Sequence, residues 1–171
     1  MKDIFLLYDV FEKHEREKFI NDIQKFIVDG AELNAFYGAR GYPEGFDWFK
    51  ISHPTLHVLP EFEKLHQHVL DLIKKEFGLN LEIKRSWGNL TKGQRKKVGW
   101  HNHDGDPDYS MVYYMKLPLP FFSTGTLFKD YGLVKAKQNS LMLFDSSVDH
   151  STPPSPFPLE RYTWAMDLKL F

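Results

Sequence analysis

A small set of polar residues in this chain could bind a metal ion and, beside it, an anion. His101 and His103 stand two positions apart, and His150 comes much later in the sequence. Imidazole nitrogens are common ligands for transition metals. Beyond His150, Arg161 and Thr163 offer a guanidinium and a hydroxyl that can together hold a carboxylate. The residue types therefore predict a metal site combined with an anion-binding site.

The spacing of the first two histidines suits a strand. Residues two apart on a strand point to the same side, so His101 and His103 can address one point while Asn102 faces away. Two histidines and one carboxylate leave adjacent positions on Fe(II) for a chelating cosubstrate and O2. Here a histidine, His103, occupies the usual carboxylate position, so we expect three histidines, with Asp104 or Asp106 as the alternative. On its own, a pair of histidines two positions apart on a strand is more often a pair of surface or hydrogen-bonded structural residues than a metal site.

Short aromatic or β-branched runs, separated by Gly, Pro or Asp, dominate the chain after residue 80 and predict strands. With one N-terminal run, they are Asp3 to Tyr8, Leu81 to Leu90, Val98 to His103, Tyr109 to Leu117, Thr124 to Phe128, Ser140 to Asp145 and Arg161 to Leu170. Several short strands of this kind predict a sandwich or barrel. His150 falls just past an apolar strand, where ligands commonly lie, and Thr152 to Pro158 is predicted to be a rigid surface connection.

Two helices are predicted in the first part of the chain. Asp9 and Glu12 resemble a capping box, and apolar residues recur at helical spacing from there to Gly30. A second apolar period of the same kind runs from Pro60 to Gly78. We expect these helices to cover one face of a sheet.

The segment between the helices, Ala31 to Pro60, holds several glycines and prolines among aromatic residues and has no sustained period. Segments of this kind form lids and binding loops, or they pack irregularly against the domain. Both interpretations fit the sequence.

The composition limits the fold and the kind of metal site. With 171 residues the chain suits one domain with one core. Aromatic residues make up 16% of it, which favours strands and a wide interior over a helical bundle. Because cysteine is absent, a metal must be held by His, Asp or Glu.

Charge and the N-terminal residues limit the partners. The formal net charge of −1 offers no general attraction to nucleic acid or to an anionic membrane. Too few apolar residues precede the first charges for a signal sequence or a membrane span, so we expect an intact soluble start and a cytoplasmic protein. The basic run Lys92 to Lys97 is either a solvated turn or a rim that recruits an acidic polypeptide or nucleic acid.

Two other histidine pairs fit metal binding less well. His53 and His57 are four positions apart, but Pro54 disfavours an uninterrupted helix there. His66 and His68 are two positions apart on a predicted helix, so they point to different faces and we expect both at the surface.

Several segments together resemble a known superfamily. They are Ser86 to Asn89, Trp100 to His103, Tyr109 to Tyr114, Gly125 to Leu127, Leu143 to His150 and Glu160 to Thr163. In order and spacing, residues 81 to 171 resemble the 2-oxoglutarate and Fe(II)-dependent oxygenase superfamily. The chain is similar to a bacterial and phage branch that carries His-Asn-His, and more distantly to prolyl hydroxylases. Residues 1 to 80 match only as the usual pair of preceding helices.

The resemblance implies a fold and a ligand set. The fold would be mainly β (α+β): a double-stranded β-helix, or jelly roll, with two N-terminal helices packed on one sheet. A single domain would span residues 1–171, with a helical part at 1–80 and the jelly-roll core at 81–171. His101, His150 and, by position, His103 would be the catalytic residues that hold Fe(II).

The resemblance also implies an activity. Arg161, assisted by Thr163, would hold the distal carboxylate of 2-oxoglutarate, and Tyr114 would bind the same carboxylate or simply fill the barrel. With O2, the site would hydroxylate a protein side chain or a small molecule. Two alternatives remain open: a non-catalytic jelly-roll module with a structural metal, and a cupin-like dioxygenase that does not use 2-oxoglutarate, which leaves Arg161 without a role.

Overall fold

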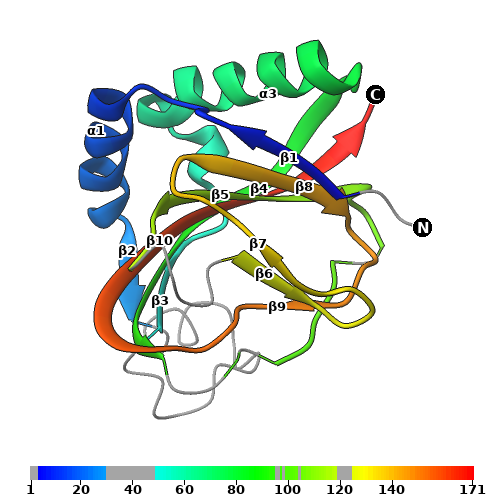
Figure 1. The fold of residues 1–171 in the computed structure, drawn as a ribbon. Helices are drawn as coiled ribbons and strands as arrows, with labels where there is room; N and C mark the ends of the chain where they lie inside the picture. Colours follow the sequence, from blue (N-terminus) through cyan, green and yellow to red (C-terminus); the bar gives the residue numbers. More distant parts are fainter. Residues whose placement is uncertain (1–3, 30–48, 95–96, 98, 104, 119–124) are drawn as a thin grey trace.

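The larger of two sheets forms the centre of the molecule in a computed structural model that describes residues 4–29, 49–94, 97, 99–103, 105–118 and 125–171 (Figure 1). It has seven strands in the order β1-β8-β5-β10-β4-β3-β2, and all neighbours are antiparallel. The strands are β1 (Ile4–Tyr8), β2 (Ile27–Asp29), β3 (Phe49–Ser52), β4 (Leu81–Gln94), β5 (Tyr109–Lys116), β8 (Ser140–Asp145) and β10 (Ser155–Leu170).

The smaller sheet lies on the opposite side of the larger sheet from the helices (Figure 1). Its order is β7-β6-β9, with β6 (Gly125–Phe128), β7 (Gly132–Lys135) and β9 (His150–Ser151). An isolated antiparallel bridge between His101 and His150 extends this sheet by one position. The two facing antiparallel sheets confirm the predicted mainly β jelly roll.

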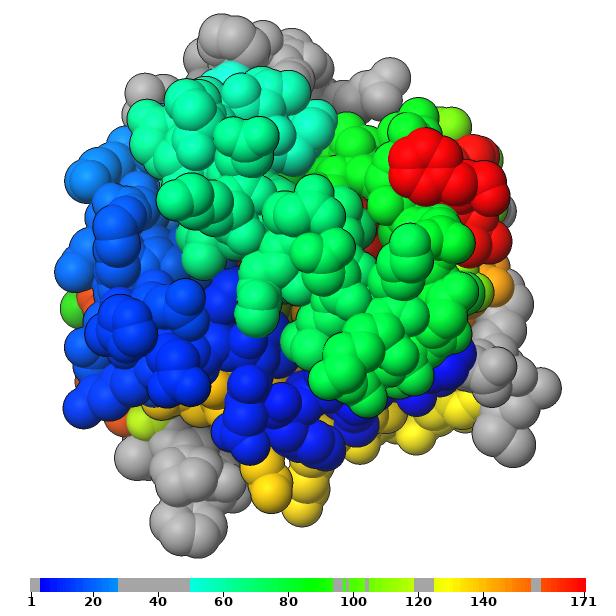
Figure 2. All heavy atoms as spheres, turned by 90° about the horizontal axis from the view of Figure 1, so that it is seen from above, coloured from blue at the N-terminus to red at the C-terminus, as the bar shows by residue number. Residues whose placement is uncertain are grey.

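Two helices cover the outer face of the larger sheet, as predicted. They are α1 (Lys13–Gln24) and α3 (Glu63–Phe77), and the short 3-10 turns η1 (Leu56–Val58) and η2 (Pro60–Phe62) lead into α3. Seen from above, the first half of the chain, blue to green, makes up most of this face (Figure 2). Among the described residues, no helix is both long and apolar enough to cross a membrane.

The sequence predicted the end of the second helix correctly, but it predicted neither end of the first helix. The second ends at Gly78 in a left-handed conformation, φ 70°, as the sequence predicts. The capping box of the first was predicted wrongly, because Glu12 is the N-cap and pairs with Glu15, while Asp9 has a φ of 54° in the preceding turn. The first helix also stops at Gln24, because the chain turns there into β2.

Side-chain alternation along β10 separates the two faces of the larger sheet. Trp164 points toward the helices, and its ring centroid lies 4.7 Å from that of Phe19 in α1. The core on this side is apolar and aromatic. The residues of β10 that face the smaller sheet are Arg161, Thr163, Ala165 and Asp167. This inner face therefore carries the polar residues of the strand.

Three predicted segments differ from the structure or lie partly outside the described residues. Of the predicted strand Val98 to His103, only His101 among the described residues forms β pairing, through its bridge. The predicted connection Thr152 to Pro158 already contains the start of β10 at Ser155. In the segment Ala31 to Pro60, residues 31–48 lie outside the described chain, and the described remainder contains β3, which the sequence analysis did not predict.

Candidate metal and anion site

The three histidines of the predicted metal site lie together at the junction of the two sheets. One ring nitrogen from each of His101, His103 and His150 falls within 4.8 Å of the others. The ring centroids of His101 and His150 are 4.4 Å apart, and those of His103 and His150 are 5.2 Å apart. Residues far apart in the sequence therefore form one cluster of imidazoles.

Backbone hydrogen bonds hold the two ligand segments against each other. The N–H of His101 donates to the carbonyl of His150 at 3.1 Å, and the reverse bond measures 2.8 Å. The N–H of His103 donates to the carbonyl of Ser146 at 2.8 Å. On the outside, the Asn102 amide donates to Asp149 Oδ1 at 2.9 Å. Asn102 thus faces away from the cluster, as predicted, and joins the two segments from behind.

Each histidine is oriented by a hydrogen bond at Nδ1. Nδ1 of His101 lies 2.9 Å from the carbonyl oxygen of Gly99, and Nδ1 of His150 lies 2.9 Å from that of Val148. Nδ1 of His103 contacts a carboxylate oxygen of Asp167. Because these oxygens can only accept, Nδ1 carries the proton in each ring. In a neutral ring Nε2 then keeps its lone pair, which is the arrangement of metal-binding histidines.

Desolvation lowers the pKa of two of these rings. Burial as the first cause and the nearby His101 as the second lower the pKa of His150 to about 3. Desolvation also lowers the pKa of His101, although the residue as a whole is exposed. A neutral imidazole binds a metal without first releasing a proton. His101 and His150 are therefore ready to accept a cation at neutral pH.

A buried carboxylate behind the cluster escaped the sequence analysis. Asp167 is fully buried on β10, where it contacts His103 and forms an ion pair with Arg85 Nε at 2.7 Å. Ser110 Oγ donates to it at 3.4 Å. The available signal was an acidic residue in an otherwise apolar strand, at even spacing from Arg161. Asp167 supports a histidine in the way that carboxylates support metal-bound histidines.

The carboxylates considered from the sequence have other positions. Asp104 lies outside the described residues. Asp106 is exposed, and its carboxylate lies 3.7 Å from Lys169 Nζ. The expectation of three histidines rather than a carboxylate from Asp106 therefore agrees with the described geometry, although it stays a prediction until a metal is bound.

Arg161 lies on the inner face with its guanidinium buried, since the residue is only 5% exposed. Its Nη2 donates to the carbonyl of Gly125 at 3.2 Å, and its central carbon lies 5.6 Å from the Tyr114 ring centroid. Nε has no hydrogen-bond partner among the described residues. Among the described residues no carboxylate pairs with this cation. A buried, uncompensated charge is costly, so the geometry indicates an anionic ligand.

Gly125 allows the close packing around this cation. Its φ is 137°, and a Cβ there would lie 2.0 Å from the carbonyl oxygen of Val134. Glycine is therefore required at the position that supplies the carbonyl to Arg161.

The two hydroxyls predicted to assist Arg161 already have partners. Tyr114 is fully buried, with its hydroxyl 2.6 Å from Thr126 Oγ1, and burial raises its pKa to about 12. Thr163 Oγ1 accepts from the Asn89 amide at 3.4 Å. Tyr114 therefore packs as a barrel-filling aromatic that stacks near Arg161, while its role toward a carboxylate stays a prediction.

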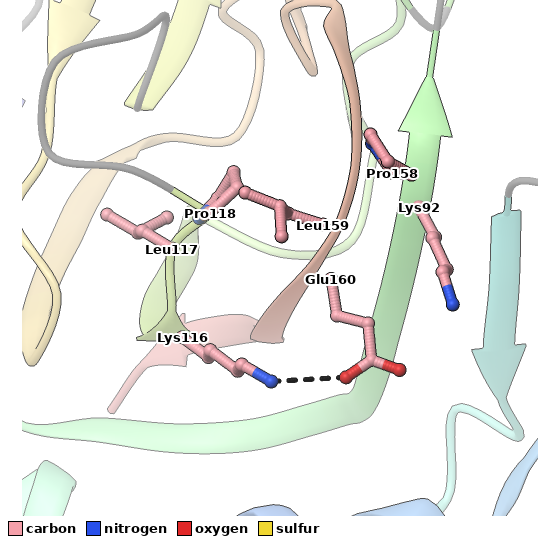
Figure 3. A pocket seen from close by; sticks show the side chains of 7 residues that line it. All are labelled: Lys92, Lys116, Leu117, Pro118, Pro158, Leu159 and Glu160. Atoms are coloured by element: carbon pink, nitrogen blue, oxygen red, sulfur yellow. Dashed lines mark hydrogen bonds and ion pairs between the residues drawn. The ribbon is translucent and has the colours of Figure 1, made fainter.

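A surface pocket lies near the start of β10 but contains none of the predicted site residues (Figure 3). It is lined by Lys92, Lys116, Leu117, Pro118, Pro158, Leu159 and Glu160. Lys116 and Glu160 form an ion pair across it at 3.1 Å. The pocket is therefore separate from the histidine cluster and the buried arginine.

Of the other histidine pairs, His66 was predicted wrongly. It is 5% exposed on α3, where Nδ1 contacts the carbonyl of Phe62 and Nε2 contacts Ser86 Oγ, both at 2.8 Å. Burial lowers its pKa to about 4. His68 is exposed, as expected. Both His66 nitrogens are occupied by protein groups, so this ring is structural.

Comparison with known proteins gives matches at the level of the fold. No model of a known protein family matches the chain, and no curated protein does. HygX from Streptomyces hygroscopicus, solved with nickel, 2-oxoglutarate and hygromycin B, is 14% identical with a TM-score of 0.64, over 98% of this chain and 83% of HygX. A 2OG-Fe(II) oxygenase family oxidoreductase from Burkholderia pseudomallei is 14% identical with a TM-score of 0.66, over 97% and 84%.

A viral protein is similar over almost its whole length. The collagen prolyl hydroxylase vCPH from Paramecium Bursaria Chlorella virus-1, in its 2-oxoglutarate complex, is 11% identical with a TM-score of 0.68, over 98% of this chain and 96% of vCPH. These matches agree with the resemblance seen in the sequence. The chain has the double-stranded β-helix fold of the 2-oxoglutarate and Fe(II)-dependent oxygenases.

Proposed function

We propose that this protein is a 2-oxoglutarate- and Fe(II)-dependent oxygenase. The observation that carries the proposal is the pairing of two incomplete sites on one inner face. One is a cluster of three oriented imidazoles, and the other is the buried cation of Arg161, which no described carboxylate neutralises. A ligand that chelates a metal at one end and carries a carboxylate at the other would complete both.

The donor set fits a transition metal. Three imidazole nitrogens suit iron, and the cluster includes no thiolate and no exposed carboxylate pair of the kind that Ca²⁺ or Mg²⁺ prefers. His101, His103 and His150 would hold the ion, while Asp167 fixes the orientation of His103.

The remaining residues would bind and orient the cosubstrate. Arg161 would take the distal carboxylate through its unpartnered Nε, with Thr163 beside it on the same face. When bound, the metal with 2-oxoglutarate and O2 supplies the oxidation of a substrate C–H bond. The buried residues of the inner face keep bulk water from the carboxylate, which strengthens its attraction to the guanidinium.

The substrate would be a protein side chain or a small molecule, hydroxylated at carbon. Structures with the same fold cover both classes: HygX was solved with hygromycin B, and vCPH is a collagen prolyl hydroxylase. Trp100 next to His101 is 39% exposed, and Lys97 Nζ lies 3.7 Å from its ring centroid. This aromatic and cationic rim would contact the substrate.

Anaerobic calorimetry tests the proposal. The protein is titrated with Fe(II) or Mn(II) and then with 2-oxoglutarate, and succinate formation is measured in air with pools of candidate substrates. We expect metal binding followed by metal-dependent binding of 2-oxoglutarate. Metal binding without any 2-oxoglutarate affinity would contradict the proposal and favour a structural metal module or a cupin-like dioxygenase.

A further inference from the structure

Two residues that are paired between β4 and β10 each have a buried polar atom without a hydrogen-bond partner among the described residues. Thr91 is 2% exposed, and within the described part of the chain its Oγ1 has no hydrogen-bond partner. Arg161 is 5% exposed, and its Nε likewise has none. The two residues are direct partners in the register of the strands. Directly opposed residues of antiparallel strands share a face, with Cβ atoms about 5 Å apart.

Such atoms are uncommon in folded proteins, where nearly all buried polar groups are paired. In the described part of the chain, the other buried side-chain atoms without a hydrogen bond are His57 Nδ1 and Asp167 Oδ2, and the latter lies in an ion pair with Arg85. Two of these few atoms therefore belong to residues that are direct partners on neighbouring strands. That juxtaposition indicates a shared ligand.

The neighbouring polar groups on this face each have at least one hydrogen-bond partner. The Asn89 amide donates to Thr163 Oγ1, and the hydroxyls of Tyr114 and Thr126 contact each other. Thr91 is the next residue of β4 on the inner face after Asn89, by strand alternation. Its hydroxyl is free both to donate and to accept, whereas that of Thr163 already accepts one hydrogen bond and keeps its proton to donate.

We propose that Thr91 donates a hydrogen bond to the carboxylate held by Arg161, so that the anion site spans β4 and β10. The inference rests on the proposed function and adds a binding residue to it. A guanidinium and a hydroxyl from two paired strands approach one carboxylate from two sides. The site then selects a planar anion of carboxylate size.

The test compares Thr91→Val with Thr91→Ser in metal-loaded protein. Titration of the Mn(II)-loaded protein with 2-oxoglutarate should give about tenfold weaker binding for Thr91→Val, since a hydrogen bond to a charged group is lost. Thr91→Ser should bind as the wild type does. In the ligand-free protein, urea unfolding of Thr91→Val should occur at the same or a higher midpoint, because an unpaired buried hydroxyl is removed.

Ser52→Ala is the matched control. The Ser52 hydroxyl is also fully buried on the sheet, but it accepts a hydrogen bond from the Gly88 N–H at 2.9 Å. Its loss should lower the urea midpoint and leave 2-oxoglutarate affinity unchanged. Loss of the Thr91 hydroxyl should therefore lower 2-oxoglutarate affinity and not stability, whereas loss of the Ser52 hydroxyl should lower stability and not 2-oxoglutarate affinity.

Two results overturn the inference while leaving the proposed function intact. One is equal 2-oxoglutarate affinity of the wild type and Thr91→Val. The other is a lower urea midpoint of ligand-free Thr91→Val, which would show that the hydroxyl serves the fold. If the wild type binds Mn(II) but not 2-oxoglutarate, the proposed function itself fails, and the inference with it.

Discussion

The two faces of the larger sheet differ in whether their buried polar groups have partners within the protein. On the outer face, under the helices, His66, Ser86 and Trp164 form a closed chain: Nε2 of His66 contacts Ser86 Oγ, which accepts from Trp164 Nε1 at 2.7 Å. On the inner face, the imidazole cluster is open toward a cation, and Arg161 has no described carboxylate partner. The outer chain of His66, Ser86 and Trp164 is complete without a ligand, whereas the polar groups of the inner face have room for one.

This difference separates residues that stabilise the fold from residues that serve a ligand. A satisfied buried group contributes to stability, and removing its partner costs free energy. An unsatisfied group weakens the free protein, so its retention indicates a partner that arrives later. Substitutions on the two faces should therefore change different quantities.

The largest effect is expected from the histidine cluster. His101→Ala or His150→Ala should abolish metal uptake, because each removes one of three convergent donors. Anaerobic titration with Fe(II) or Mn(II) measures this. His68→Ala, an exposed histidine outside the cluster, is the control and should bind metal normally. If His101→Ala binds metal as the wild type does, the histidine cluster is not the metal site.

Arg161→Met should separate ligand binding from stability most clearly. We expect 2-oxoglutarate affinity to fall about a hundredfold with metal binding intact, because a charge-assisted pair is lost. The ligand-free variant should unfold at the same or a higher temperature, since a buried unpaired charge is replaced by an apolar chain. Calorimetry and thermal unfolding check the two effects, and a strong loss of stability would assign Arg161 to the fold instead.

Asp167→Asn should weaken metal binding without removing it. The amide keeps the shape but no longer holds His103 with a charge, and such losses cost about tenfold to a hundredfold in metal affinity. Competition with a metal chelator gives the affinity. Arg85→Met tests the same contact from the other side, since Arg85 pairs with Asp167. An unchanged metal affinity for Asp167→Asn would limit its role to packing.

Ser86→Ala should act on stability alone, and it is the smallest of these effects. The change leaves the Trp164 N–H and the His66 ring without their shared partner, at a cost of about 2 kcal/mol. Urea unfolding measures the loss, while metal and 2-oxoglutarate affinities should stay within error of the wild type. A changed ligand affinity would mean that the two faces are coupled through the sheet.

Local patterns were sufficient to predict much of the fold. The apolar period and Gly78 defined α3, and runs of aromatic and β-branched residues located β4, β5 and β8. The strands β3 and β9 escaped prediction because each is short and exists through pairing with distant residues. The capping box was displaced to Glu12 because two acidic residues stand at suitable spacings, and only tertiary packing selects between them.

The sequence predicted those site residues whose type alone indicates a chemical role. Histidines and an arginine in an apolar context stand out, and the fold brings His101, His103 and His150 together. Thr91 carries no such local signal, and Asp167 carries only the weak signal of an acidic residue within a predicted strand. Their importance depends on which residue lies opposite on a neighbouring strand, and that register is a long-range property of the chain.

The unbroken pairing of β10 with β4 from Arg161 to Asp167 has one further consequence. Asp167 contacts His103 of the cluster, and Arg161 is the proposed anion-binding residue, so both stand on one strand, about 20 Å apart along the backbone at 3.3 Å per residue. No loop lies between them to adjust the interval. The separation between the carboxylate behind the histidine cluster and the buried guanidinium is therefore set by the strand itself rather than by a loop.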